Sequence, residues 1–582
     1  MKIFILSLFF YSIMMAESDV DTQFQTLSNE YLNQFPAFDP IGATSLGDHR
    51  FDHILNDISS IARDKELEFN KKILGQLIQI PRSKLSRAHQ VDAALLENRL
   101  MFNIWRSEIL KEWSWNPLIY TALVGNSIYS LMAREFAPIE DRLINVTNRL
   151  EDFPRLYSQI REIIVPELVP RIHAETAIKQ NKGFSSIIDN LVIPNLETLK
   201  SKDQRRLQKA IKKAKEENSK YQEWLENNLL PNATGEFRIG SELYDKKLAF
   251  TLQTTLSRQE IMTRAQSELV NTRKEMYDIS KEVYKSLHPY TNFPDLPSSE
   301  FKQAIIRSAL EEAYKKIPDK DGIIDFARSS IIIAEKFVKE AEILTLPPDP
   351  VEIIEMPEFR RGVTLAYCDS PGPLEIGLKT FYAVSPLPKD WSEKQINSYL
   401  REYNQWSVHN LTIHEAMPGH FVQLAYSNRY PSKLRAVLSS GVFIEGWAVY
   451  IERVFLEQGF LDHDPLMQLI ILKWYLRAIA NAIIDQQIHA GNITYEEVMK
   501  LMIEDTFQEE REAAAKWIRA QLTSSQLSTY FVGFQEHYSL RKEVQNVRGD
   551  NFNLKDYHDE KLSFGSPPVQ YVRALILDKP IP

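Results

Sequence analysis

The sequence predicts a mostly helical protein with a small β-sheet. Apolar residues recur at helical spacing in seven long segments, whereas only two short stretches are rich in β-forming residues. The chain has 582 residues, of which 44% are hydrophobic and 25% are charged, which is typical of a globular protein with a large core. Its net charge of -9 argues against a nucleic-acid partner.

The helical segments are spread over most of the chain. We expect helices at residues 143–164, 196–228, 258–285, 323–344, 393–414, 442–458 and 466–489. Pro154 should break or kink the first segment, because proline lacks the amide hydrogen that a regular helix needs. Gly459 follows the segment 442–458 and Gly491 follows the segment 466–489, and both are typical helix stops.

The two β-rich stretches lie close together at residues 362–367 and 380–384, on either side of a turn-rich segment. The strongly apolar stretch at residues 466–484 is interrupted by Lys473 and Arg477, so we interpret it as a buried core helix and not as a membrane span. Lysines and arginines in residues 200–220 alternate with glutamate and glutamine, which is typical of a solvated helix face.

The N-terminal residues are typical of a secretory signal. Lys2 is followed by apolar and small residues as far as Ala16, and this run is shorter than the roughly 20 residues that a membrane span needs. An uncleaved membrane anchor is the alternative. We predict that residues 1–16 are a signal peptide, that the chain reaches a bacterial periplasm or the exterior, and that no stable membrane insertion follows cleavage. Cys368 is the only cysteine, so an internal disulfide is excluded.

Residues 17–582 are predicted to form a single helical domain. Two clusters of prolines, near residues 290 and 350, interrupt its middle. They favour two lobes with a boundary near residues 290–350.

Residues 413–420 read I-H-E-A-M-P-G-H and bring together His414, Glu415 and His420. A zinc peptidase site uses these residue types, because neutral imidazoles bind the metal and a nearby carboxylate activates water. A histidine on an apolar helix can also be a hydrogen-bonded core residue. The two histidines are six residues apart, and on an unbroken helix they would point roughly 120° apart.

Pro418 and Gly419 suggest how the histidines could meet. Proline cannot continue a regular helix, and glycine adopts backbone angles that other residues avoid. We therefore predict that the helix bulges at Pro418 and returns His420 to the face of His414. The two imidazole rings should then lie within about 5 Å of each other, since zinc–nitrogen bonds are near 2 Å.

Glu445 completes the predicted metal site. It lies in the apolar segment F-I-E-G-W-A-V-Y-I-E, where a buried carboxylate is costly unless it is paired or binds a cation. We expect one zinc ion bound by His414, His420 and Glu445, with Glu415 as the general base. Glu452, two turns further on, could accept a hydrogen bond from a ligand imidazole, or could be a surface residue that pairs with Arg453.

These motifs resemble a large bacterial family catalogued as domain of unknown function 885, which is grouped with the H-E-x-x-H (gluzincin-like) metallopeptidase superfamily. The family pattern H-E-A-x-P-G-H followed by E-G-W-A stands here at residues 414–420 and 445–448. Supporting motifs are A-T-S-L-G-D at residues 43–48, Q-x-x-x-Y-x-x-G at 526–533, and Y-H-D with G-S at 557–559 and 565–566. The similarity extends over nearly the whole chain after the signal peptide.

The resemblance implies a two-lobed helical metallopeptidase-like fold with a deep cleft, similar to the angiotensin-converting-enzyme type. It also implies a later Tyr or His that stabilises the oxyanion, for which Tyr530 and His558 are the candidates; either residue could instead be bonded in the core. Arg519 could hold a substrate carboxylate or form an internal ion pair. Residues 380–384 could pair with a peptide as an exposed strand, or be a plain core strand.

We therefore predict an exported zinc metallopeptidase that hydrolyses peptide bonds, in short peptides if the cleft is deep. Two alternatives stay open. The protein could be an exported binding or scaffold protein that keeps the fold without activity, or a zinc hydrolase of a non-peptide amide or ester.

Overall fold

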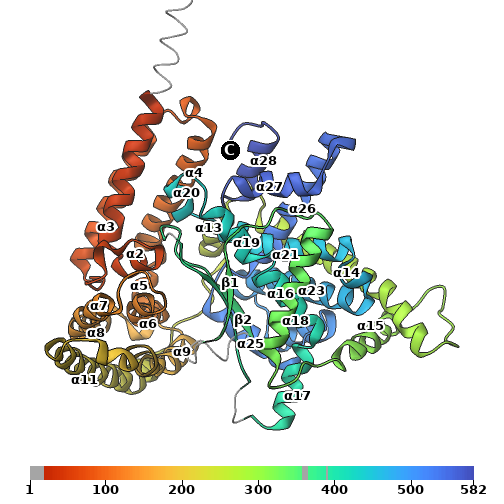
Figure 1. Cartoon of the computed structure of the whole chain (residues 1–582), viewed down its shortest axis with the longest axis horizontal. Helices are drawn as coiled ribbons and strands as arrows, with labels where there is room; N and C mark the ends of the chain where they lie inside the picture. Colours follow the sequence, from red (N-terminus) through yellow and green to blue (C-terminus); the bar gives the residue numbers. More distant parts are fainter. Residues whose placement is uncertain (1–18, 357–364, 376, 388–390) are drawn as a thin grey trace, which may run out of the picture.

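A computed structural model describes residues 19–582 apart from 357–364, 376 and 388–390. The chain is mostly helical with one three-stranded sheet, which confirms the predicted fold class. Figure 1 shows the N-terminal helices on one side, the later helices on the other, and the strands between them. The predicted signal peptide, residues 1–16, and residues 362–364 of the predicted strand 362–367 lie outside the described residues.

The N-terminal helices pack mainly around an apolar core of their own, to which Leu143, Leu150 and Tyr157 contribute fully buried side chains. Residues 19–34 are helical and pack with the next long helices in a smaller cluster. The α-helices that follow are α2 (Pro40–Leu46), α3 (Ser60–Gln79), α4 (Arg87–Trp105), α5 (Glu112–Trp115), α6 (Leu118–Met132), α7 (Ile139–Glu151), α8 (Phe153–Ile163), α9 (Arg171–Asn181), α10 (Gly183–Ile187), α11 (Ser201–Trp224) and α12 (Leu230–Asn232).

The later elements surround the largest core, which extends from Tyr244 to Val572. They are α13 (Ser241–Leu252), α14 (Arg258–Leu287), α15 (Ser299–Tyr314), α16 (Ile323–Glu340), β1 (Val351–Glu355), β2 (Ala366–Asp369), β3 (Thr380–Val384), α17 (Glu393–Glu402), α18 (Gln405–Glu415), α19 (His420–Ser427), α20 (Lys433–Val437), α21 (Gly441–Gln458), α22 (Phe460–His463), α23 (Pro465–Ala490), α24 (Tyr495–Lys500), α25 (Glu510–Leu522), α26 (Ser528–Arg548), α27 (Leu554–Ser563) and α28 (Val569–Ile576). A two-lobed arrangement with a deep cleft and a boundary near residues 290–350 stays a prediction.

Helices occupy most of each of the seven predicted segments, and two segments are divided between two α-helices. In the segment 196–228, α11 begins only at Ser201, and in the segment 323–344, α16 ends at Glu340. The segment 143–164 breaks between α7 and α8, where Pro154 occupies the first turn of α8, as expected. The segment 393–414 breaks at Tyr403 and Asn404, because the Asn404 side chain accepts a hydrogen bond from the Ser407 amide and begins a new helix, α18.

By length and composition alone, α23 could cross a membrane, and it is the one such helix among the described residues. Most of its apolar window is buried inside the protein. Lys473 on α23 is fully buried, and its ammonium group lies 2.8 Å from the Glu402 carboxylate. Helix α23 is therefore a central core helix, as the sequence predicts.

The sheet has the strand order β1-β3-β2. Strand β3 pairs with β1 in parallel and with β2 in antiparallel register, so β3 is central. Of the two alternatives for residues 380–384, an exposed strand that pairs with a peptide is excluded and a core strand is correct, because both sides of β3 already carry a strand. Strand β1 is not predicted by the sequence pattern. Strand β2 contains the last two residues of the predicted strand 362–367 and the two residues after it.

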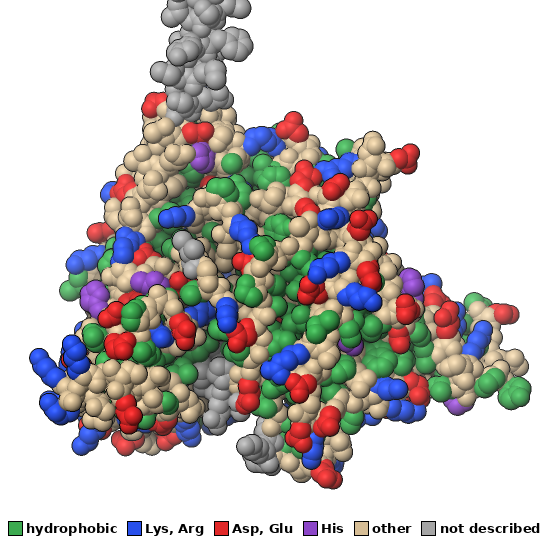
Figure 2. All heavy atoms as spheres, viewed as in Figure 1, with side chains coloured by type: hydrophobic (Ala, Val, Ile, Leu, Met, Phe, Trp, Pro, Cys, Tyr) green, Lys and Arg blue, Asp and Glu red, His purple; other side chains and the backbone are tan. Residues whose placement is uncertain are grey.

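The surface carries interspersed charges of both signs, as Figure 2 shows for one face. The basic residues of α11 fit this pattern. Arg206 pairs with Glu151 and Lys215 with Asp189 on neighbouring elements, at 2.6 Å in both cases. Residues 200–220 therefore form a solvated helix face, as expected.

The N-terminal helices are fixed to strand β2 and to the loop that follows it. Asp369, the last residue of β2, accepts hydrogen bonds from Tyr129 and Arg134. The Leu374 amide donates to the Leu46 carbonyl at 2.9 Å. Gly47 adopts a φ of 89°, and a side chain there would meet the Glu375 amide at 2.7 Å. The A-T-S-L-G-D motif is thus a docking surface for the loop after β2.

His49 adds a charged contact to this junction. Its two ring nitrogens lie 2.9 Å from the Asp52 carboxylate and 3.1 Å from the Glu375 carboxylate, and its ring stacks on Phe136. Burial lowers the pKa of His49, but the hydrogen bonds and charges of Asp52 and Glu375 outweigh it and raise the pKa to about 9.

We expect His49 to stabilise the fold in a pH-dependent way. An unfolded histidine has a pKa of about 6.5, so the contribution is fully present below that pH and is lost as pH rises through about 9. The Tm difference between wild type and His49→Gln should be large at pH 6 and small at pH 10. His53→Gln, at an exposed neighbouring position, is the control. A Tm difference that does not change with pH would contradict this assignment.

Candidate metal site

The two candidate histidines lie on two different helices. Helix α18 ends at Glu415, where the amides of Ala416 and Met417 both donate to the Thr412 carbonyl, and α19 begins at His420. The predicted bulge within one continuous helix is therefore wrong. The chain instead leaves the helix for four residues and starts a second one, because Pro418 cannot continue the hydrogen-bond pattern of α18.

Gly419 allows this turn to be tight. A side-chain carbon at this position would lie 1.8 Å from the His414 carbonyl oxygen, so glycine is required by the close approach of the backbone. The buried Trp447 indole donates a hydrogen bond to the Pro418 carbonyl at 3.1 Å and fixes the turn from α21. As a result, the rings of His414 and His420 have centroids 4.8 Å apart, within the expected limit.

Glu445 on α21 faces both histidines. Its Oε2 lies 3.5 Å from His420 Nε2 and 4.0 Å from His414 Nε2. Burial raises the pKa of Glu445, but the hydrogen bond with His420 and the charges around it lower the pKa overall. Among the described residues, these three side chains form the one group of histidine, cysteine and acidic residues close enough to hold a metal ion, with ligand atoms within 4.8 Å of one another.

Glu452 orients His414 from behind. Its Oε1 accepts a hydrogen bond from His414 Nδ1 at 2.6 Å, and its Oε2 accepts one from Asn410 at 2.7 Å. Glu452 is buried, whereas Arg453 pairs with Glu275 and Glu457, so the surface alternative for Glu452 is wrong. Because Nδ1 is engaged, Nε2 of His414 is the nitrogen that faces Glu445.

The protonation of His414 depends on this carboxylate cluster. Burial lowers the pKa of His414, but its hydrogen bond to Glu452 and the charges of Glu452, Glu415 and Glu445 raise the pKa to about 9. A cation is therefore favoured at this position. A proton on Nε2 and a metal ion compete for the same place, since a metal binds only the neutral imidazole.

Glu415 directly follows His414 in the chain and is held by the sheet. Its Oε2 accepts a hydrogen bond from the backbone amide of Cys368 on β2 at 3.0 Å. The charge of Glu415 also contributes to the raised pKa of His414, which indicates that its carboxylate is close to that ring. Strand β2 thus orients the carboxylate that the sequence predicts as a general base.

Tyr530 reaches the site through a close crossing of α21 and α26. Gly446 follows Glu445 directly, and Gly533 lies one turn after Tyr530. A side-chain carbon on Gly446 would lie 2.4 Å from the Gly533 backbone, and one on Gly533 would lie 2.2 Å from the Val442 carbonyl oxygen. The glycine of the Q-x-x-x-Y-x-x-G motif therefore lets α26 approach α21 at the level of Glu445.

Within the described part of the chain, the Tyr530 hydroxyl accepts hydrogen bonds and donates none. Gln526 and Arg519 both donate hydrogen bonds to its oxygen, at 3.3 and 3.2 Å, so the hydroxyl hydrogen is left for another acceptor. Burial and then the charge of Glu445 raise the pKa of Tyr530 to about 12, so the group stays protonated at neutral pH. Both properties suit a hydrogen-bond donor.

His558 is not brought to the site. Its Nδ1 donates to the Ile343 carbonyl and its Nε2 accepts from the Tyr450 hydroxyl, and the residue is fully buried. With both nitrogens engaged in the core, His558 has no position left for an oxyanion, and we drop it as a candidate. The motif around it is structural: Asp559 accepts two hydrogen bonds from Thr345.

The three ligand candidates fit a zinc ion. A tetrahedral site with bonds of about 2.0–2.1 Å separates its ligand atoms by roughly 3.3 Å. The separations here are 3.5 and 4.0 Å to Glu445 and at most 4.8 Å overall, so small side-chain movements would close the site. Two imidazole nitrogens and a carboxylate, with a carboxylate behind one imidazole, are the donors and the support that zinc uses.

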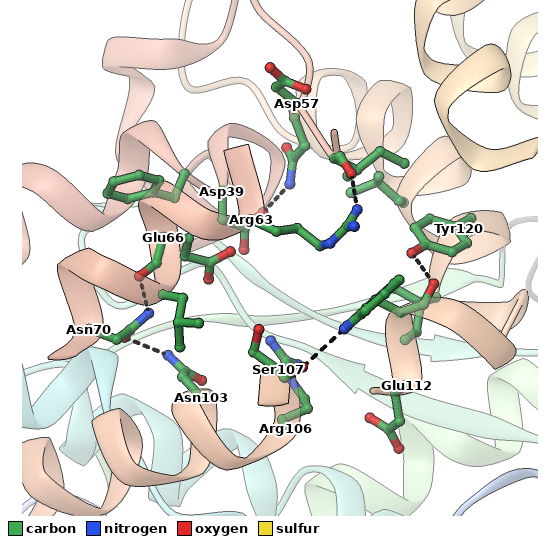
Figure 3. Close-up of a pocket in the computed structure, with 17 residues that line it drawn as sticks. Asp39, Asp57, Arg63, Glu66, Asn70, Asn103, Arg106, Ser107, Glu112 and Tyr120 are labelled. Carbon is green, nitrogen blue, oxygen red and sulfur yellow. Dashed lines mark hydrogen bonds between the residues drawn. The ribbon is translucent and has the colours of Figure 1, made fainter. Parts of the chain in front are cut away.

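A separate cavity of about 290 Å³ lies among the N-terminal helices. Figure 3 shows Arg63 and Glu66 of α3 and Tyr120 of α6 around it. Its lining residues all fall within 38–123, whereas the candidate metal site uses residues 410–452 and 530. This cavity is therefore not the cleft of the candidate metal site.

The crossing of α21 and α26 generates a stability prediction. Gly446→Ala places a methyl group against the backbone of Gly533, which cannot move aside as a flexible side chain would. We expect unfolding in urea to become easier by about 1–3 kcal/mol, which is typical of overpacking. Gly75→Ala is the matched control, because space is open around Gly75 inside α3 and alanine favours a helix. Equal stability of the two variants would contradict the tight crossing.

Residues 40–576 match a family described as a bacterial protein of unknown function, DUF885. A solved structure from Shewanella oneidensis, titled a "putative lipoprotein of unknown function", is 32% identical with a TM-score of 0.80, over 95% of this chain and 99% of that one. A crystal structure from Colwellia psychrerythraea, also titled a "putative lipoprotein", is 19% identical with a TM-score of 0.78, over 96% and 99%, and shows the same fold. None of the curated proteins matches. The chain therefore belongs to the DUF885 family of bacterial proteins.

Proposed function

We propose that this protein is an exported zinc-dependent peptidase of the gluzincin type. One observation carries the proposal: His414, His420 and Glu445 converge from three helices with ligand atoms within 4.8 Å of one another. Glu452 holds the first histidine, and Glu415 lies beside the cluster. The sequence distance between these residues makes their convergence unlike a chance surface cluster.

His414 Nε2, His420 and Glu445 would hold the metal, and Glu452 would keep His414 in the tautomer that binds it. When bound, zinc supplies a Lewis acid that acidifies water and polarises the peptide carbonyl. The remaining steps belong to side chains of this protein.

Glu415 is suited to move the proton. It would accept a proton from the attacking water and pass it to the nitrogen of the leaving amine. The Cys368 amide bonds one of its oxygens, which fixes the carboxylate and leaves the other oxygen for this transfer. Tyr530 would donate its free hydroxyl hydrogen to the oxyanion that forms when water attacks the carbonyl.

The alternatives explain the geometry less well. An inactive binding or scaffold protein needs neither a carboxylate behind His414 nor a tyrosine with an unused hydrogen beside Glu445. A zinc hydrolase of a non-peptide amide or ester would use the same residues. The motifs at residues 414–420 and 445–448, which resemble those of metallopeptidases, favour a peptide substrate.

Export is part of the proposal. It is supported by the N-terminal pattern of Lys2 followed by an apolar run to Ala16, and by the titles of the two solved relatives, which call each of them a "putative lipoprotein". Periplasm and exterior are both compatible with this support.

The proposal predicts separate effects on metal and on turnover. His414→Ala, His420→Ala and Glu445→Ala should lose zinc, measured by elemental analysis of purified protein, because each removes one of three ligands. Glu415→Gln should keep one zinc per chain and lose turnover by about 10²–10⁴-fold, because only proton transfer is removed. Retained turnover in Glu415→Gln would reject its role as base, and unchanged zinc in all three alanine variants would reject the site.

Glu452 provides a second test. Glu452→Gln keeps the size of the side chain but removes the charge that supports His414, so zinc affinity should fall by about 10–100-fold in a competition with a chelator. Glu457→Gln, further along α21 and bonded to Arg541, should keep its zinc affinity. Equal affinities of the two variants would show that Glu452 does not support the metal.

A further inference from the structure

Arg519 is a positioned cation without an acidic partner. It lies on α25, and its Nη2 donates to Gln526 Oε1 at 3.0 Å and to the Tyr530 hydroxyl at 3.2 Å. No carboxylate lies within ion-pair distance of it among the residues that the structure describes. The internal ion pair that the sequence leaves open for Arg519 is therefore not formed in this part of the chain.

The other cations of this region are already engaged. Lys473 and Arg477 both contact the Glu402 carboxylate, and Lys473 is fully buried. Lys516 is buried one turn before Arg519, with Glu512 at 3.9 Å. Arg519 is exposed, and both of its partners are neutral. Gln526 and Tyr530 take the two hydrogens of Nη2, so within the described part of the chain the hydrogens of Nε and Nη1 are left to bind a carboxylate.

Its place beside Tyr530 decides which carboxylate it can reach. The Tyr530 hydroxyl is one hydrogen bond from Arg519 and, in the proposed reaction, one hydrogen bond of about 2.7 Å from the oxyanion. A carboxylate bonded to Arg519 would therefore lie within about 9 Å of the reacting carbonyl. An extended peptide covers about 3.3–3.6 Å per residue, so this distance allows one or two residues after the bond that is cleaved.

We infer that Arg519 binds the C-terminal carboxylate of the substrate, so that the enzyme removes one or two residues from the free C-terminal end of a peptide. This inference rests on the proposed function and adds the class of substrate to it. The recognised group is the carboxylate itself, because the Nε and Nη1 hydrogens of the charged guanidinium can donate to it, and the neutral neighbours Gln526 and Tyr530 orient the guanidinium through Nη2 without neutralising it.

The test uses the full-length mature protein with zinc and a peptide library made in two forms. The forms have the same sequences and differ only in a free C-terminal carboxylate or a C-terminal amide. Mass spectrometry identifies the products, and kcat/KM is measured for the best substrate in both forms. We expect release of one or two C-terminal residues and a preference of about 10–100-fold for the free acid, which is the range for a lost charged hydrogen-bond pair.

Three variants separate carboxylate binding from support of Tyr530. Arg519→Ala should lower kcat/KM for the free acid by about 10–100-fold and leave the amide nearly unchanged, so that the preference disappears. Tyr530→Phe should lower both forms equally and keep the preference. Arg511→Ala, at the start of α25 where the arginine stacks on Trp391, should change neither.

The results that would overturn the inference differ from the result that would reject the proposed function. Equal cleavage of acid and amide by the wild type, or internal cleavage far from the C-terminus, would overturn the inference and leave the proposed peptidase intact. An equal loss on both forms in Arg519→Ala would also overturn it, since Arg519 would then act only through Tyr530. Cleavage of neither form by zinc-loaded wild type would instead reject the proposed function.

Discussion

The turn between α18 and α19 is the constraint on which the rest of the site depends. Residues 416–419 must reverse the chain sharply enough for His420 to face His414, and the backbone of Gly419 approaches the His414 carbonyl so closely that a side chain is excluded. The hydrogen bond from the Trp447 indole to the Pro418 carbonyl ties this turn to α21. The same helix carries Glu445 and Glu452. This hydrogen bond therefore links the turn that places the two histidines to the helix that carries the two carboxylates.

Glu415, His414 and Tyr530 are each positioned by an element other than their own. Glu415 on α18 is bonded by β2, His414 by α21, and Tyr530 on α26 lies near Glu445 because two glycines let their helices touch. Strand β2 is itself fixed to the N-terminal helices through Asp369. The geometry of the site therefore depends on contacts across the whole fold, which accounts for motifs of the family that lie far from the histidines in sequence.

The sequence predicts the helices well because their apolar residues repeat with the period of the helix. It offers His414 and His420 as ligand candidates because they lie in one short motif, and Glu445 because it is a carboxylate in an apolar segment. It does not predict the break at Asn404, where a single capping side chain outweighs a continuous apolar pattern. The Cys368 amide and the crossing of Gly446 with Gly533 also give no signal, since backbone donors and close approaches depend on tertiary contacts. His558 is misassigned because residue type alone does not reveal that both nitrogens are engaged in the core.

The central claim is that one zinc ion binds between His414, His420 and Glu445. A crystal of the purified protein, measured on both sides of the zinc absorption edge, tests it directly. We predict a single anomalous peak at about 2.0–2.1 Å from Nε2 of His414, with His420 and Glu445 as the other protein ligands. The absence of a peak there after equilibration with zinc, or coordination through Nδ1 of His414 with Glu452 displaced, would contradict the account.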